Sequence, residues 1–147
     1  MNVSGRNTLN APPERVWPLI FDPNSLITLV PGCQQLEQVA PGEYQGHLRI
    51  GFAAVSGKYD LLVKVIEEEA PNHCTFEGQM TGPTGMITGQ ASFSLQAVDK
   101  DTLIEYQAQA IITGSLGFIS PRILESIAKT LLNQGMVEMN KTLTNED

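Results

Sequence analysis

The sequence predicts an α+β fold: a curved, seven-stranded antiparallel sheet wrapped around one long C-terminal helix, with two short helices between strands one and two. Two patterns carry this prediction. Between residues 34 and 113, apolar and polar residues alternate in successive segments, which is typical of half-buried strands. From residue 121, apolar residues recur every three or four positions, which is typical of a helix. The 147 residues suit a single domain over 1–147, with an ordered core from about residue 3 to 143.

The first strand and the two short helices come first in the chain. Residues 3–10 alternate weakly between apolar and polar side chains, which favours a strand. The prolines at 12 and 13 suit the start of a helix, because first-turn N–H groups have no intrahelical partner in any case. Pro18 lies inside this helix and cannot donate to the carbonyl four residues earlier, so we expect a short or kinked helix. Asp22 then caps a second short helix over residues 23–30.

The stretch "LVPGCQ" joins the second short helix to the second strand. Pro31 presets φ for the first central position of a β-turn, and Gly32 can take the positive φ of the second. Cys33 and Cys74 lie far apart in the chain, so we expect both to be reduced, small, buried residues. A reactive role for Cys33 is the alternative.

Six further strands and the long helix complete the prediction. Short links rich in Gly, Pro and Asp separate the strands and favour an antiparallel meander. Ser120 and Pro121 start a helix of about 24 residues, roughly 36 Å long, which we expect to cross the concave face of the sheet. The expected strands are 34–39, 43–52, 57–69, 73–80, 86–98 and 102–113.

Alternation divides each strand into two faces, and the less polar face should point toward the helix. This inner face mixes small and large apolar residues and is almost free of ionisable groups. Such a face can either form a filled core or leave an apolar cavity, and Met136 and Met139 of the helix would adapt to a variable guest. The inward residues are expected to be Tyr59, Leu61, Val63, Val65, Cys74, Phe76, Gly78, Met80, Ile87, Ala91, Phe93, Leu95, Ile104, Tyr106, Ala108, Ala110 and Ile112.

The motifs for catalysis and metal binding are incomplete. "GFAAVSGKY" resembles a phosphate-binding loop but has the wrong glycine spacing and Tyr59 where Ser or Thr must hold magnesium. His73 and Cys74 point to opposite faces of one strand, and neither cysteine has a second one nearby, so we expect no metal site. Tyr59 and Tyr106 are the inward polar candidates, either with a structural partner or bonded to the head group of a ligand. We expect no catalytic residue and no cofactor.

Charge and hydropathy limit the partners. Acidic residues outnumber basic ones 16 to 9, and no basic cluster stands out, so we expect no nucleic-acid binding. No segment approaches the roughly 20 apolar residues of a membrane span, and no signal peptide is evident at the N-terminus. We therefore expect a cytoplasmic protein.

The order of elements and several short motifs resemble the CoxG family of carbon monoxide dehydrogenase subunits, within the START-like (SRPBCC) superfamily that also includes polyketide cyclases and birch-pollen-allergen-like proteins. The resemblance covers about residues 3–140. Its most specific part is "DPNSLITLVPGCQQLE", supported by "APPERVW", "SGKYDLLVKV", "GPTGMITGQASFSL" and "TGSLGF". Pro18 departs from the family pattern, and the C-terminal membrane-attachment extension of longer members is missing. We expect no stable membrane anchor, and leave peripheral membrane contact open.

The resemblance implies a helix-grip fold with an apolar cavity between sheet and helix. It implies non-catalytic binding of a hydrophobic small molecule, such as a lipid or isoprenoid quinone, beside a molybdenum hydroxylase of the carbon monoxide dehydrogenase type. The alternatives are an enzyme of the cyclase or hydratase kind and a pure assembly or interaction subunit. Leu29 and Val30 are expected at the cavity mouth. The expected lining is Trp17, Tyr59, Leu61, Phe76, Met80, Phe93, Tyr106, Ala108, Leu131 and Met136.

Overall fold

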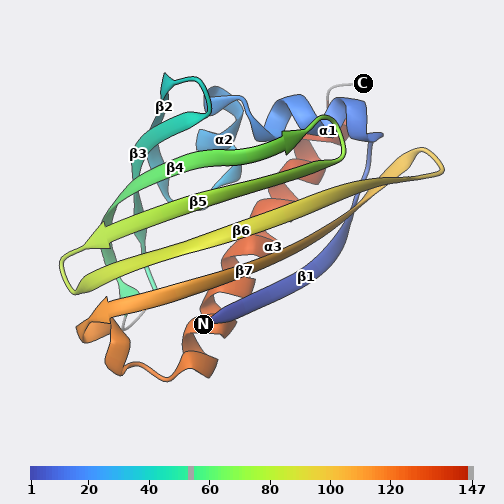
Figure 1. Cartoon of the computed structure of the whole chain (residues 1–147). Helices are drawn as coiled ribbons and strands as arrows, with labels where there is room; N and C mark the ends of the chain where they lie inside the picture. The colour runs from blue at the N-terminus through green and yellow to red at the C-terminus, as the bar shows by residue number, and fades with distance from the viewer. Residues whose placement is uncertain (53–54, 146–147) are drawn as a thin grey trace.

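One antiparallel sheet organises the protein (Figure 1). The structure is a computed structural model that describes residues 1–52 and 55–145. Within these residues the elements are, in chain order, β1 (Asn2–Leu9), α1 (Pro13–Ile20), α2 (Pro23–Leu29), β2 (Cys33–Ala40), β3 (Glu43–Ile50), β4 (Gly57–Glu69), β5 (His73–Gly82), β6 (Gly85–Val98), β7 (Asp101–Gly114), the 3₁₀ turn η2 (Ser115–Phe118) and α3 (Pro121–Asn145).

The seven strands follow the order β1-β7-β6-β5-β4-β3-β2, and every pair of neighbours is antiparallel. Strands β2 to β7 form the predicted meander. β1 lies at the far edge and pairs with β7, where Val3 is opposite Ala108. The chain then passes through α1 and α2 to reach β2 at the other edge, so the two short helices connect the two edges of the sheet.

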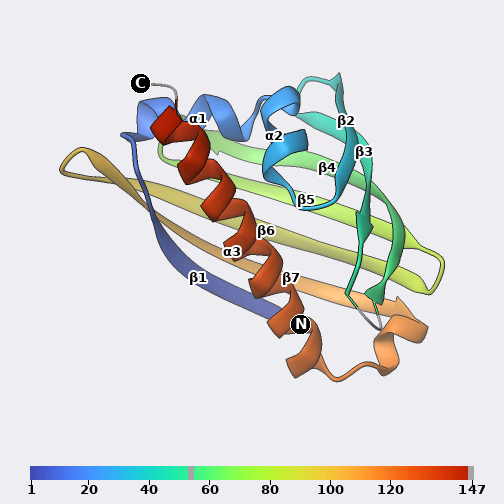
Figure 2. The ribbon, with the colours of Figure 1, turned by 180° about the vertical axis from the view of Figure 1, so that it is seen from behind.

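The long helix α3 lies across one face of the curled sheet, as the views from both sides show (Figures 1 and 2). It has 25 residues and is therefore about 38 Å long. β6 and β7 have 14 residues each and reach about 45 Å. The predicted packing of the helix on the concave face is confirmed. The strands' bounds differ by one or two residues from the predicted ones, and η2 was not predicted.

Buried apolar side chains form two clusters, one toward each end of α3. The C-terminal cluster contains Leu9, Ala11, Val16, Leu29, Cys74, Phe93, Leu95, Ile104, Met139 and Leu143. The N-terminal cluster contains Leu48, Ile50, Val55, Tyr59, Leu116 and Leu124. Removing these side chains from water supplies roughly 25 cal/mol for each Å² of apolar surface, and this burial holds the helix on the sheet.

The short helices begin and end as their residues dictate. The carboxylate of Asp22 accepts hydrogen bonds from the backbone N–H of Asn24, at 3.1 Å, and from the hydroxyl of Ser25, at 2.9 Å. This is the predicted cap of α2. α1 continues through Pro18 and ends at Ile20, so it is short as predicted.

The turn between α2 and β2 has the predicted geometry. Gly32 has a φ of +78°, and the N–H of Cys33 donates to the carbonyl of Val30 at 3.1 Å. The carbonyl of Gly32 also accepts a hydrogen bond of 2.9 Å from the N–H of Arg49 in β3. A Cβ at position 32 would collide with the carbonyl oxygen of Arg49. Gly32 is thus required both by its φ and by the close approach of β3.

The two cysteines differ, which corrects the expectation that both are buried. Cys74 is fully buried in the C-terminal cluster. Cys33 is only half-buried and packs beside the N-terminal cluster. Burial raises the pKa of Cys74 to about 11, with Glu68 adding to the shift. Burial also raises the pKa of Cys33, and its hydrogen bond to the carbonyl of Gln35 acts in the opposite direction. Alternation alone did not distinguish the two, because Cys33 lies at the end of an edge strand.

We predict that Gly32→Ala destabilises the fold by about 2 kcal/mol or more, because it combines a disfavoured positive φ with a backbone collision. Chemical denaturation of both proteins measures this change. Gly78→Ala is the matched control, since a Cβ there would lie 3.7 Å from its nearest neighbour, the carbonyl oxygen of Leu62. Equal losses in the two variants would contradict the assignment.

We also predict that iodoacetamide labels Cys33 of the folded protein well before Cys74. The reactive species is the thiolate, and Cys74 is both inaccessible and held as a thiol. Mass spectrometry of the labelled peptides measures the order. In urea the two should react at similar rates, and comparable labelling of both in the folded protein would refute the burial assigned to Cys74.

Candidate functional site

The inner face of the sheet, which points toward α3, is the candidate site. The expected alternation is confirmed: Leu61, Phe76, Met80, Phe93 and Ile112 pack in or beside the two clusters. Their neighbours in sequence point to the opposite face, which is largely polar. Among the described residues that β4 to β7 turn inward between the two clusters, none is Asp, Glu, Lys, Arg or His. The inner face therefore offers an apolar contact surface.

One carboxylate shares the inner side of the sheet at its rim. β4 has a bulge between Val65 and Glu67, and beyond it Glu68 lies opposite Cys74 of β5. The register shift thus reverses the alternation at the end of β4, which the sequence pattern did not reveal. Glu68 is exposed, so it borders the inner face without being buried in it.

Small residues occupy the middle of the inner face. Gly78 of β5, Gly89 of β6 and Ala110 of β7 lie opposite one another in register. In the next inward row, Ala91 is opposite Ala108. A Cβ on Gly89 would press on the main chain of β7, so this glycine lets β6 and β7 approach closely. The two clusters are thus separated by a band of short side chains across the central strands.

The helix is less well buried opposite this band than at its ends. Leu124 near the start of α3, and Met139 and Leu143 near its end, are buried. Between them, Ile127, Leu131 and Met136 are only half-buried although they face the sheet. The opposing Ala91, Ala108 and Ala110 are half-buried too. Apolar groups on both sides of the central sheet–helix space therefore remain partly accessible to solvent.

The structure divides the expected lining residues between the two ends of this space. The first group packs in or against the C-terminal cluster, the second in or against the N-terminal one, and Ala108 lies in the band between them. The first group is Trp17, Phe76, Phe93, Tyr106 and Met136. The second group is Tyr59, Leu61, Met80 and Leu131.

Aromatic rings dominate the C-terminal side. Trp17 lies 4.8 Å from Phe21 and 5.9 Å from Phe93 between ring centroids, and Phe76 lies 6.4 Å from Phe93. These are ordinary separations for packed aromatic pairs. Phe21 belongs to this aromatic group but was not expected to line the site, because the end of a short helix does not reveal which way its last side chain points.

The tyrosines differ in their partners. The buried hydroxyl of Tyr59 donates to the carbonyl of Val55 at 2.7 Å, so this tyrosine has a structural partner. The hydroxyl of Tyr106 lies over Gly5 of β1, where a Cβ would leave it only 2.5 Å away. Burial raises the pKa of both phenols. Tyr44 of β3, which was missed, also points inward, and its hydroxyl donates to the carbonyl of Phe21 at 3.3 Å. The alternation of "EYQGHL" could have revealed it.

The residues expected at the mouth lie where α2 meets α3. Leu29 is buried in the C-terminal cluster, while Val30 is half-buried at the end of α2. A Cβ on Gly135 of α3 would lie 3.2 Å from the carbonyl oxygen of Leu29, so the two helices touch closely here. The role of Leu29 and Val30 at a mouth stays a prediction.

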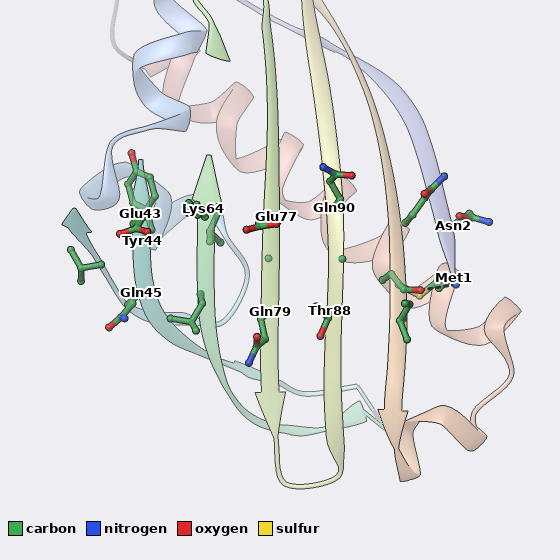
Figure 3. Close-up of a pocket in the computed structure, with 18 residues that line it drawn as sticks. Met1, Asn2, Glu43, Tyr44, Gln45, Lys64, Glu77, Gln79, Thr88 and Gln90 are labelled. Atoms are coloured by element: carbon green, nitrogen blue, oxygen red, sulfur yellow. Dashed lines mark hydrogen bonds between the residues drawn. The ribbon is translucent and has the colours of Figure 1, made fainter. Parts of the chain in front are cut away.

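A separate hollow of about 840 Å³ lies on the outer face of the sheet (Figure 3). Glu77, Gln79, Thr88 and Gln90 of β5 and β6 and Lys64 of β4 line it, together with exposed Leu62 and Ile111. None of the expected lining residues belongs to it. The hollow is open and mixed in polarity, which suits an apolar guest less well than the inner face does.

Polar side chains with catalytic potential lie outside the inner face. The ring nitrogens of His73 lie 3.2 Å from the hydroxyl oxygen of Ser94 and 3.3 Å from that of Thr75, on the outer face. Within the part of the chain that the structure describes, no three His, Cys, Asp or Glu side chains are arranged to hold a metal ion. In the same residues, no helix is both long and apolar enough to cross a membrane.

Comparison with solved structures supports the fold. A conserved protein from Geobacillus kaustophilus is 29% identical, with a TM-score of 0.94 over 99% of this chain and 96% of that chain. A START superfamily protein from Mycobacterium smegmatis is 12% identical, with a TM-score of 0.76 over 99% of each chain. The second likeness shows a shared START-like fold and nothing more. No protein of curated function matched the sequence.

A family comparison covers almost the whole chain. Residues 5–144 match CoxG, the family described as the G-type subunit of carbon monoxide dehydrogenase. The match includes every helix and nearly all of every strand, and it agrees with the motifs from "APPERVW" to "TGSLGF". The protein therefore belongs to the CoxG family of carbon monoxide dehydrogenase subunits.

Proposed function

We propose that the protein binds a hydrophobic small molecule between the inner face of the sheet and α3, without catalysing a reaction on it. The observation that carries this proposal is the central band, where short apolar side chains face a half-buried stretch of the helix. The family and the START-like fold point to hydrophobic-ligand binding or an accessory role. We propose that the protein acts in the cytoplasm.

The ligand class follows from the lining. Because β4 to β7 turn no charged side chain inward between the two clusters, a charged guest would lose its hydration without a compensating partner. An apolar guest gains roughly 25 cal/mol per Å² of buried surface, so a few hundred Å² suffice for useful affinity. An elongated molecule of the lipid or isoprenoid-quinone type suits a space between two long apolar surfaces. The half-buried Tyr106 can offer a hydroxyl to its head group.

Binding is preferred to catalysis because the inner face holds few groups that exchange protons. Apart from the exposed Glu68 at the rim, the protic side chains that β4 to β7 turn inward are Tyr59, Cys74, Thr102 and Tyr106. Tyr59 and Thr102 each donate a hydrogen bond of 2.7 Å to a main-chain carbonyl, of Val55 and Ala11 respectively. The raised pKa values of Cys74 and Tyr106 keep both protonated near neutral pH. A cyclase or hydratase needs an acid or base with a pKa near the working pH, and these four groups supply none.

The family suggests the protein partner. We propose that the protein serves as an accessory to a molybdenum hydroxylase of the carbon monoxide dehydrogenase type, to which it would bring or from which it would remove its apolar ligand. The family description supports this association. A pure assembly subunit would need the partner but no ligand, so ligand uptake by the isolated protein separates the two roles.

We predict that Ala108→Phe lowers uptake of a quinone or fatty acid at least about tenfold, because the ring would occupy the central band. Gln107→Phe is the matched control, since the neighbouring side chain on β7 is exposed on the outer face. Native mass spectrometry after solvent extraction and incubation with menaquinone or palmitate measures uptake, and a thermal melt of each variant checks the fold.

The melting temperature helps to separate a cavity from a filled core. If the space is open, Ala108→Phe should fold with nearly unchanged stability and lose uptake. If the core is filled, overpacking should cost about 1–3 kcal/mol. No uptake by the wild-type protein, or equal uptake by both variants, would overturn the proposed function.

A further inference from the structure

One end of the molecule exposes large apolar side chains. Phe118, in η2, is 92% exposed, and Ile123, in the first turn of α3, is 52% exposed. Both lie where the chain passes from β7 into α3. A single exposed apolar residue is common in proteins, but an almost fully exposed phenylalanine close in sequence to a second exposed apolar side chain marks a candidate contact surface.

Three segments meet at this end, at the lower left of Figure 1. The N–H of Leu116 donates to the carbonyl of Thr84 at 3.1 Å, and the hydroxyl of Ser115 donates to the same oxygen at 3.0 Å. A Cβ on Gly57 would lie 3.4 Å from Pro83. We call this surface the tip and define it as the described residues of 49–58, 81–86 and 113–124.

The charge of the tip differs from that of the chain. The sequence of its three segments contains Arg49, Lys58 and Arg122 and no Asp or Glu, whereas the whole chain has 16 acidic and 9 basic residues. Arg49 and Lys58 lie directly opposite each other in β3 and β4, and both are exposed. Like charges in such a pair repel each other, and an anionic surface would relieve this repulsion.

We propose that the tip docks on a lipid bilayer with anionic head groups, with Phe118 inserted at the interface and the three basic side chains contacting the head groups. An aromatic ring inside a basic rim matches the two attractions available at such a surface, apolar burial and charge. This inference concerns a different surface from the ligand site, and vesicle binding requires no bound ligand.

The net charge of −7 does not prevent this docking. Electrostatic interactions fade over about 8–10 Å at physiological salt, so the charges nearest the membrane decide. Asp99 and Asp101 lie at the opposite end of the β6–β7 hairpin, about 45 Å away along the strands. The acidic residues nearest to the tip in sequence are Asp60, opposite His47, and Glu125, whose carboxylate accepts a hydrogen bond of 3.1 Å from the N–H of Asn2.

The tip also adjoins the N-terminal end of the sheet–helix space. Leu116 belongs to the N-terminal cluster, and Ile119 packs against it together with Leu61 and Leu131. A bilayer at the tip would thus lie next to residues at one end of the proposed ligand site. If both proposals hold, an apolar ligand has a short path between membrane and protein.

The test is co-sedimentation of the full chain with vesicles of phosphatidylcholine containing phosphatidylglycerol, compared with pure phosphatidylcholine. We expect binding to the anionic vesicles that weakens at high salt. Phe118→Ser should lower the partition constant at least about tenfold, and Lys58→Gln and Arg122→Gln about fivefold each. The matched controls lie at the opposite end: Val98→Ser, which changes a 47% exposed apolar side chain, and Lys100→Gln should leave binding unchanged.

Thermal melts verify that the exposed substitutions leave the fold intact. Absence of vesicle binding by the wild-type protein would overturn the proposal, as would equal losses in Phe118→Ser and Val98→Ser. Phe118-dependent self-association without vesicle binding would assign the tip to a second copy of the chain instead. None of these outcomes depends on ligand uptake, so failure here leaves the Ala108→Phe experiment unaffected.

Discussion

The structure depends on covering one wide apolar sheet face with one helix. Seven strands about 4.8 Å apart span roughly 29 Å, whereas a helix with its side chains is about 10–12 Å wide. α3 alone cannot cover this face, so the sheet curls around it, and α1, α2 and η2 close the ends (Figure 2). The dense packing is consequently at the two ends of α3, where these shorter elements add side chains, and the centre is buried less completely.

The centre is also where the sheet has its smallest side chains. Gly89 is required there because β7 approaches closely, whereas Gly78 opposite it has room for a larger side chain. The same band therefore combines a backbone constraint with unused volume. This arrangement suits an interior that accepts a guest, because shape rather than charge selects what fits. The charged groups of the protein are left for the outer face, the rim and the tip.

Much of the fold could be predicted from local patterns, since alternation with a period of two and recurrence every three or four residues report directly which face is buried. Phe93, Ile104 and Met139 are buried as these patterns indicate. The site was less predictable. Leu29 and Val30 share one helix end, yet only Leu29 is buried, and Cys33 remains half-exposed at an edge. Their environments depend on α3 and β3, which are distant in sequence.

The sequence by itself determined the order and type of the elements, the polarity of each sheet face, the turn at Gly32 and the family, because each depends on short-range periodicity or on a local motif. Only the tertiary structure decided where packing is complete. It paired the hydroxyl of Tyr59 with a main-chain carbonyl, left the middle of α3 half-buried and brought Arg49, Lys58 and Phe118 to one end. These features arise from contacts between segments far apart in the chain, which no local pattern encodes.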